Sequence, residues 1–328
     1  TCYENDMFEE YTPLHFAAIH GHFSVCQLII QCHKAANPNE DILDNLEYIG
    51  YSNEEYVKYN PLWAAYNAKQ FDICKLIIEN LIDKNPVWQN QVDYAEEDAT
   101  ALHAFAELGH LEICEIIVKS IRKDTHPTDK DGWTPFHSAA FWGHLSICKL
   151  FIEHFDDKNP VDQECLTPLH IAAENGNLDI CEIIIYQVRK DAHPTDNKGR
   201  TPFHLAALKG HLFICKLIIG HFDVKNPVNQ EFVTPLHIAA ENANWDICKL
   251  ILEYLINKNP QYYGDGTTAL HKFAQLGQWD ICEIIIKSIQ KDKHPTDNAG
   301  RTPFHLAASE GHLYICTLIS EHFEDKNP

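Results

Sequence analysis

Several features that define other classes of protein are missing from this 328-residue sequence. Basic residues are scarce: 26 Lys and Arg face 47 Asp and Glu, for a formal net charge of −21. A nucleic acid would be repelled by this field, and no basic stripe offsets it. The sequence also lacks an apolar run of about eighteen residues, the length that a membrane-spanning helix needs. We therefore expect no nucleic-acid partner and no membrane insertion by this chain.

The N-terminus lacks an initiator Met, and it lacks the basic start and apolar run of a signal peptide. The last sequence unit, which ends at Pro328, has no polar cap of the kind that closes a helical array. Both observations predict that the sequence is a fragment of a longer protein.

Catalytic motifs are missing as well. The sequence contains no glycine-rich phosphate loop, no Gly-x-Ser-x-Gly elbow and no His-Glu-x-x-His pair. It has 21 His and 12 Cys. They are spread along the chain, whereas a zinc site needs closely spaced ligands that converge on one point. We predict that the protein is not an enzyme and has no cofactor and no metal site.

What the sequence does have is an internal repeat. A four-residue phrase, Thr-Pro-Leu-His or a close variant, recurs nine times, and from Thr100 onward its spacing is 33 or 34 residues. The copies begin at Thr12, Asn60, Thr100, Thr134, Thr167, Thr201, Thr234, Thr268 and Thr302. A Cys follows each copy in the same register, and all 16 Pro fall either inside the phrase or in a closing Asn-Pro or His-Pro pair. Such placement is typical of helix caps and turns, because Pro is excluded from helix interiors.

Each unit has the pattern of two short helices joined by a turn. Thr201 is suited to cap a first helix over residues 202–209, and Pro202 is tolerated in its first turn. Gly210 is suited to end that helix, and a second helix is predicted from His211 to about residue 220. Neither helix could bury its apolar face alone, so neighbouring units must supply the core. The Ala-Ala pair that follows most copies of the phrase permits close helix contact, where larger side chains would push the layers apart.

These units resemble the ankyrin repeat. The resemblance is clearest over residues 196–215, where Asp-x-x-Gly, Thr-Pro-Phe-His, Ala-Ala and Gly-His follow one another in register. It implies an all-α, ankyrin-repeat solenoid of stacked helix–turn–helix units with β-hairpin or loop fingers. We expect a single array over residues 1–328, with repeats 1 to 9 beginning near residues 7, 55, 95, 129, 162, 196, 229, 263 and 297. The resemblance also implies that partners bind the face made by the fingers and the first helices.

Some units depart from this pattern. Cys165 and Phe232 stand where the finger signature has Gly, which predicts that these two fingers lose the usual tight turn. Repeat 2 has Trp63 in place of the phrase His and Lys69 in place of the Gly that ends the first helix. Units end either in Lys-Asn-Pro or in Asp-x-His-Pro, and the sequence alone does not explain this difference.

The nine periodic Cys are predicted to be buried, reduced thiols. Adjacent helices pack about 8–10 Å apart, whereas a disulfide needs Cα atoms within about 7 Å. Reduced thiols indicate a reducing compartment, so we expect a cytoplasmic location. Cys165 lies outside this register, in a finger, where it is either a reactive thiol or an inert exposed one.

Misplaced aromatic residues indicate where a partner would bind. Repeat 4 has Trp133 on its finger and Phe141 and Trp142 at the end of its first helix, where most units have polar residues. Exposed aromatic clusters are typical of interfaces. The alternative is that these rings pack on the neighbouring unit.

Two insertions, residues 39–59 and 87–99, lengthen the fingers of repeats 2 and 3, and both are acidic and aromatic. The second contributes Trp88, Tyr94, Glu96 and Glu97. With the aromatic residues of repeat 4, they predict a groove over repeats 2–4 for a basic segment with apolar anchors. The alternative is a solvated or partly helical insertion.

Repeat 6 carries a local basic patch of Lys198, Arg200 and Lys209, which is either a second binding site or a solvated face. The function that we predict is a non-enzymatic, cytoplasmic scaffold for protein–protein interaction, with another protein as partner and the chain itself a monomer. The alternative is a cytosolic regulatory or mechanical array that belongs to a larger channel, enzyme or host-directed effector.

Overall fold

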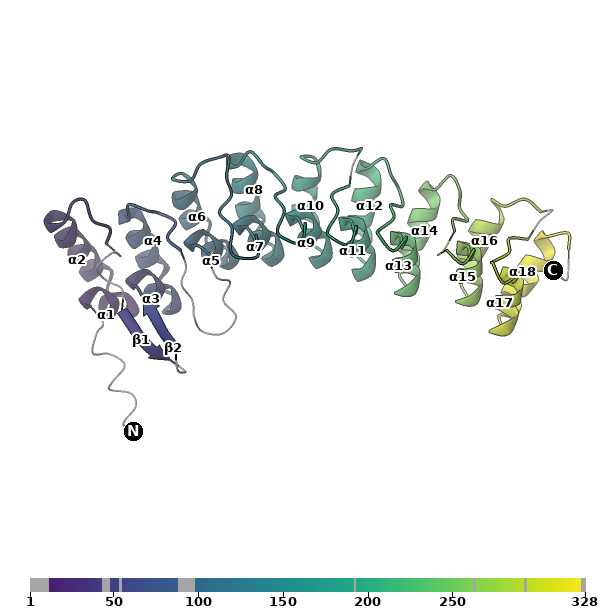
Figure 1. The fold of residues 1–328 in the computed structure, drawn as a ribbon, viewed down its shortest axis with the longest axis horizontal. Helices are drawn as coiled ribbons and strands as arrows, with labels where there is room; N and C mark the ends of the chain where they lie inside the picture. Colours follow the sequence, from purple (N-terminus) through teal and green to yellow (C-terminus); the bar gives the residue numbers. More distant parts are fainter. Residues whose placement is uncertain are drawn as a thin grey trace, which may run out of the picture. The chain divides into compact units, whose positions relative to one another are not determined.

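The computed structural model describes residues 12–42, 48–52, 55–87, 98–191, 193–261, 264–291 and 294–325. Within these residues the chain forms 18 α-helices and one two-stranded sheet (Figure 1). Each repeat contributes a first and a second helix. The chain divides into two compact units, residues 1–163 with repeats 1–4 and residues 164–328 with repeats 5–9. None of the described helices has the length and apolar character needed to cross a lipid bilayer.

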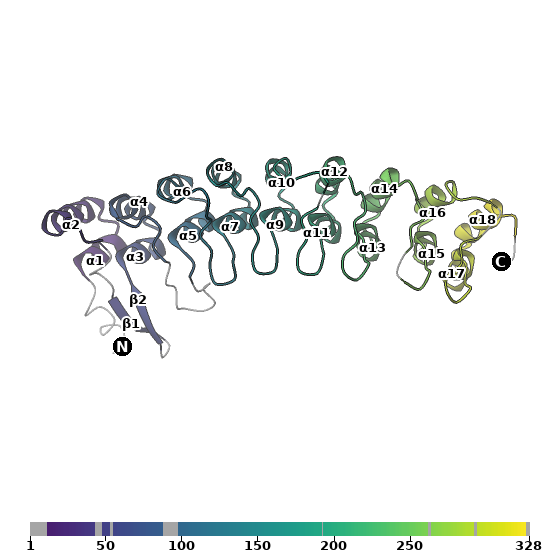
Figure 2. The ribbon, with the colours of Figure 1, turned by 45° about the horizontal axis from the view of Figure 1, so that its top comes forward.

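The first unit contains two layers of helices. Figure 2 shows its first helices between the second helices and the fingers. The first helices are α1 (Pro13–Ile19), α3 (Pro61–Asn67), α5 (Ala101–Leu108) and α7 (Pro135–Trp142). The second helices are α2 (Phe23–Ala36), α4 (Phe71–Asn80), α6 (Leu111–Val118) and α8 (Leu145–His154). Each second helix packs on the first helix of its own repeat, and neighbouring second helices pack on one another. Adjacent repeats in this unit therefore share a core.

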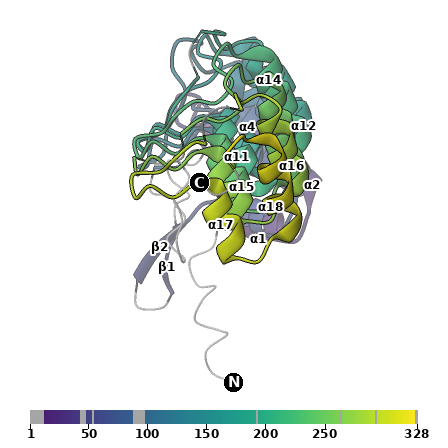
Figure 3. The same cartoon turned by 90° about the vertical axis from the view of Figure 1, so that its right-hand side faces the viewer.

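The second unit repeats this arrangement. Its first helices are α9 (Pro168–Asn175), α11 (Pro202–Lys209), α13 (Pro235–Glu241), α15 (Ala269–Gln275) and α17 (Pro303–Ser309). Its second helices are α10 (Leu178–Ile185), α12 (Leu212–His221), α14 (Trp245–Tyr254), α16 (Trp279–Ile286) and α18 (Leu313–His322). The fingers of this unit project from the helices on one side, as the end-on view in Figure 3 shows.

In every repeat except repeat 2, which has Asn60 and Trp63 instead, the phrase Thr-x-x-His starts the first helix for a local reason. In repeat 4 the Nδ1 atom of His137 accepts a hydrogen bond from the backbone N–H of Thr134 at 3.1 Å, and the Thr134 hydroxyl accepts one from the N–H of His137. Two otherwise unpaired donors at the helix start are thereby satisfied. The predicted first helix 202–209 is confirmed. The second helix of that repeat begins at Leu212 and ends at His221, one residue later at each end than predicted.

The prediction that the fingers of repeats 5 and 7 lose their tight turn is wrong. Cys165 and Phe232 adopt φ angles of 57° and 63°, the left-handed conformation that Gly adopts in the same place elsewhere. In repeat 7 the side chain of Asn229 accepts the backbone N–H groups of Glu231 and Val233, which holds the turn closed. Side-chain anchoring therefore overrides the preference for Gly, at the cost of local strain.

The periodic cysteines lie in the core. Eight of them are fully buried free thiols, and Cys316 in repeat 9 is half-buried. Burial raises the pKa of Cys74 and Cys282 to about 12, because the thiolate would lose its hydration. These thiols are therefore protonated packing groups at neutral pH.

The insertion in the finger of repeat 2 forms a β-hairpin of strands β1 (Tyr48–Ser52) and β2 (Glu55–Tyr59). The strands are antiparallel, with Tyr48 paired to Tyr59. The insertion in repeat 3 is closed at its base by an antiparallel bridge between Val87 and Thr100. The hairpin extends the finger of repeat 2, as the position of the first insertion predicted, and residues 88–97 of the second insertion lie outside the described residues.

Candidate protein-binding surface

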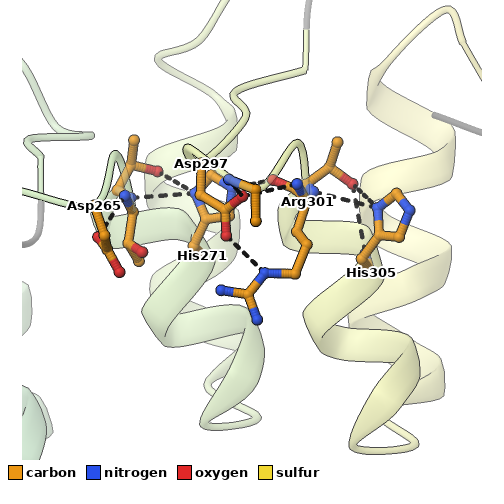
Figure 4. A network of polar contacts seen from close by, with 9 residues as sticks. Asp265, His271, Asp297, Arg301 and His305 are labelled. Carbon is orange, nitrogen blue, oxygen red and sulfur yellow. Dashed lines mark hydrogen bonds and ion pairs between the residues drawn. The ribbon is translucent and has the colours of Figure 1, made fainter.

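In repeats 4, 6, 7 and 9, one side chain at the base of the finger anchors it. In repeat 9 the Oδ1 atom of Asp297 accepts the backbone N–H groups of Ala299 and Arg301 at 2.9 and 2.8 Å (Figure 4). Its Oδ2 atom accepts Nε of Arg301 at 2.8 Å. These bonds to the ionised carboxylate hold the pKa of Asp297 below its usual range, even though burial alone would raise it. The same arrangement is present in repeat 6, where Asp196 anchors Arg200.

In repeats 3, 5, 6 and 8, the phrase histidine joins its first helix to the finger of the next repeat. His271 donates its Nε2 hydrogen to the backbone oxygen of Arg301 at 3.0 Å, while its Nδ1 atom accepts the N–H of Thr268 (Figure 4). Both ring nitrogens are used only in the neutral tautomer with the proton on Nε2. Equivalent bonds join His103 to Trp133, His170 to Arg200 and His204 to Val233.

The fingers also bond to one another through their backbones. In the second unit the N–H of Asn197 donates to the oxygen of Glu164, and that of Gln230 donates to the oxygen of Lys198. Farther along, Asn298 donates to Asp265. These bonds hold adjacent fingers in register, which makes them a pre-formed row and not a set of independent loops.

The exposed aromatic residues of the first unit lie at the end of α7. Phe141 and Trp142 are 45% and 55% exposed, and their rings meet edge to face with centroids 5.4 Å apart. Leu108, at the end of the neighbouring helix α5, is also exposed, and α5 packs directly on α7. We call Leu108, Phe141 and Trp142 the apolar surface. Large apolar groups left in water in one place are typical of binding sites.

Trp133 is on the finger as predicted, but it is half-buried. Its indole N–H donates to the hydroxyl of Ser138 at 3.0 Å, and its ring lies against His137 with centroids 5.0 Å apart. The ring thus packs on its own first helix. Trp133 therefore lies at the start of α7, whereas Phe141 and Trp142 are the exposed groups at the end of α7.

The other predicted site residues are placed as follows. Trp88, Tyr94, Glu96 and Glu97 lie outside the described residues. In the basic patch, Arg200 forms an ion pair with Asp196 at 2.7 Å, and Lys209 lies 3.4 Å from Glu174. The charges of two of its three members are therefore already balanced by carboxylates.

Two exposed groups were missed by the sequence interpretation. Leu108 holds the same register position in repeat 3 as Trp142 holds in repeat 4, so comparing equivalent positions would have found it. Phe232 is 73% exposed at the strained finger turn of repeat 7. Its signal was the replacement of Gly, which was interpreted as the loss of the turn and not as the display of an aromatic ring.

Many of the His and Cys side chains of the described residues lie in the core or form structural hydrogen bonds. Within the described ranges, no group of three or more His, Cys, Asp or Glu residues is arranged to hold a metal ion. In repeats 3, 5, 6 and 8 the phrase histidine uses both ring nitrogens in structural hydrogen bonds, and eight of the nine periodic thiols are fully buried. The geometry is that of a helical repeat protein.

The comparison with known families agrees with this class. The family pattern described as "Ankyrin repeats (3 copies)" matches overlapping stretches at residues 2–87, 62–164, 102–198, 169–262 and 236–328. The chain therefore belongs to the ankyrin repeat family, and its fold is the helical solenoid of that family. Comparison with curated protein sequences gave no match.

Proposed function

We propose that this chain is a non-enzymatic scaffold that binds another protein on the apolar surface of repeats 3 and 4. The observation that carries the proposal is the exposed pair Phe141–Trp142 beside Leu108. The equivalent positions in repeats 5, 7 and 9 have Glu or Ser and Asn or Glu, so the apolar groups are not a requirement of the repeat. Aromatic residues in this setting supply most of the binding energy of an interface.

Charge indicates the chemistry of the partner. The chain has a net charge of −21, and Glu107 lies directly before Leu108 on α5. Burial raises the pKa of Glu107, because its carboxylate is partly shielded from water. A cationic side chain of a partner, bound beside Glu107, would stabilise the ionised carboxylate in place of water. We infer a partner segment that combines Lys or Arg with an apolar anchor, and Trp88, Tyr94, Glu96 and Glu97 would extend its binding groove.

The context of the chain follows from the same features. Buried thiols are compatible with a reducing compartment, so we place the protein in the cytoplasm. A row of fingers held by hydrogen bonds requires little ordering when a partner binds, which favours recognition by a monomeric chain over a fold-on-binding mechanism.

The test begins with a photoreactive amino acid at position 142, which identifies the partner by crosslinking in cells. The affinity of that partner is then measured for the wild type and for the double variant Phe141→Ala/Trp142→Ala. Loss of two exposed anchors predicts an affinity about 30-fold weaker or more. Because both side chains are exposed, the melting temperature should change little.

The matched control is Phe213→Ala, which removes an aromatic ring that is 71% exposed on the second helix α12. It should leave the affinity unchanged. Equal affinity of the double variant and the wild type for the crosslinked partner would show that the apolar surface is not the binding site.

A further inference from the structure

The two kinds of repeat ending perform different tasks. In repeat 4, which ends in Lys-Asn-Pro, the Nζ atom of Lys158 donates to the oxygens of Ile152 and Phe155 and so caps its own helix α8. In repeat 3, which ends in His-Pro, the Nε2 atom of His126 donates instead to the oxygen of Asp157 in repeat 4, at 2.8 Å. The Lys ending is thus internal to a repeat, whereas the His ending joins two repeats.

Three further contacts support the junction of repeats 3 and 4. The ring of His126 lies against Phe155 with centroids 4.0 Å apart. His154 donates its Nε2 hydrogen to the oxygen of Ile121 at 3.0 Å. The N–H of Asp156 donates to the oxygen of Lys123 at 2.8 Å. We call these three contacts, together with the bond from His126, the loop contacts.

The loop contacts recur at two other junctions. Between repeats 5 and 6 they join His193 to Val224 and Phe222, His221 to Val188, and Asp223 to Lys190. Between repeats 8 and 9 they join His294 to Asp325 and Phe323, His322 to Ile289, and Glu324 to Lys291. Each junction consists of a His-Pro repeat followed by a Lys-Asn-Pro repeat.

The sequence separates these junctions from the others. A His-Phe pair ends the second helix in repeats 4, 6 and 9, which are the repeats that follow a His-Pro ending. Repeats 2 and 7 also end in Lys-Asn-Pro, but they do not follow such a repeat, and they have Asn80-Leu81 and Tyr254-Leu255 there. A His-Pro ending in one repeat and a His-Phe pair in the next repeat therefore occur together or not at all.

The junctions before repeats 3 and 8 are built differently. Within the described residues, α5 packs closely on α7, α9 on α11 and α15 on α17, but α3 and α5 are less close, as are α13 and α15. At both junctions a buried Phe stands in place of the first Ala of the Ala-Ala pair. Phe105 lies edge-on to Tyr66, and Phe273 lies near Trp245. The larger rings keep the first helices apart.

The second helices at these two junctions are joined by exposed ion pairs, Lys75–Glu112 and Lys249–Asp280. Such pairs contribute little to stability, because water screens them. The boundary between the two compact units, at residues 163 and 164, falls near the start of repeat 5. It therefore does not cut a junction that has loop contacts.

We propose that repeats 3–4, 5–6 and 8–9 are couplets that open and close as single units, and that opening begins before repeat 3 within the first compact unit and before repeat 8 within the second. In a repeat array, stability is a sum of terms within repeats and terms between neighbours. The loop contacts raise the neighbour term inside a couplet. The structural unit of this region is consequently the couplet, such as the 67 residues at positions 100–166, and not the single repeat.

The test is mechanical unfolding of the full chain in optical tweezers. A couplet that opens as one unit releases about 67 residues, or roughly 230 Å of extended chain at about 3.5 Å per residue. A single repeat releases about half of that length. The wild type should show the couplet-sized step, and the triple variant His126→Ala/His154→Asn/Phe155→Leu should split one such step into two. Two of its changes copy Asn80-Leu81 of repeat 2.

The control variant Tyr254→Ala/Leu255→Ala alters the same positions in repeat 7, which has no His-Pro repeat before it, and should leave the step of repeats 3–4 intact. If the triple variant does not fold, the single change His126→Ala should still split that step in a fraction of the pulls. Single-repeat steps in the wild type, one step for the whole array, or an undivided step in the folded variants would each overturn the proposal.

Discussion

At the residue scale, this protein tolerates side chains where its family pattern has Gly. Among the residues that the structure describes, five non-Gly residues have positive φ: Lys69, Asp98, Cys165, Phe232 and Ala243. Lys69 and Ala243 hold the position that ends a first helix, and the other three hold the finger turn. For an L-residue this conformation costs about 1–2 kcal/mol. The strain is therefore distributed over known positions and can be removed one residue at a time.

The change Ala243→Gly should stabilise the chain by about 1 kcal/mol, because relief of strain exceeds the added freedom of Gly in the unfolded chain. The reverse change at the same position of repeat 6, Gly210→Ala, should destabilise it, since the new Cβ would lie 2.9 Å from Oδ1 of Asn244. Urea unfolding of both variants measures the effects. A loss of stability in Ala243→Gly would contradict this account of strain.

The phrase histidines make stability depend on pH. Burial lowers the pKa of His103, His170 and His204 from 6.5 to about 4, because the charged ring would lose its hydration. Between these values the unfolded chain binds protons that the folded chain excludes. The stabilisation is therefore fully present above pH 6.5 and is lost as the pH falls towards 4.

Each of these histidines should lower the free energy of unfolding by about 3 kcal/mol between pH 7 and pH 4. The measurement is urea unfolding across this range, combined with NMR titration of the imidazole signals. At pH 5.5 the three rings should still be neutral in the folded protein. Titration of all three near pH 6.5 in the folded state would contradict the assigned hydrogen bonds.

At the element scale, the finger is a turn that one acceptor side chain closes. Asp196 accepts the N–H groups of Lys198 and Arg200 in repeat 6, and Asn229 performs the same task without charge in repeat 7. The backbone bonds, which both residues make, are thus the essential part. The ion pair to Arg200 is an addition.

The change Asp196→Ala should therefore cost about 2–3 kcal/mol, because it leaves buried backbone donors without an acceptor. Asp196→Asn, which copies Asn229, should cost less than half as much. Chemical denaturation of the two variants decides between the contributions. If Asn is as damaging as Ala, then the ion pair and not the turn holds the finger.

The sequence predicted these elements well where the signal was local. Thr201, Pro202 and Gly210 mark the ends of a helix by their own backbone preferences, so the bounds of α11 were predicted correctly. The prediction from sequence failed where the role of a motif depends on a residue far along the chain. The role of the His-Pro ending could not be predicted from its neighbouring residues, because His126 forms its hydrogen bond with Asp157 of the next repeat. The prediction for the turn at Phe232 failed for a different, local reason, because Asn229 in the same finger accepts the backbone bonds that hold the turn closed.

At the scale of the whole molecule, the repeats share one core pattern, but each unit adds its own surface. Family membership accounts for the helices and their caps. The apolar surface belongs to repeats 3 and 4 of this chain, and two of its three residues, Phe141 and Trp142, were predicted from the sequence. The single continuous solenoid over residues 1–328 stays a prediction.

The central claim is that a partner covers the apolar surface without rearranging the helices. Hydrogen–deuterium exchange of the chain with and without its crosslinked partner measures this directly. We predict slower exchange at the ends of α5 and α7, around Leu108 and Trp142, and unchanged exchange in α12, which carries the control residue Phe213. Protection of α12 with no change around Leu108 and Trp142 would contradict the account.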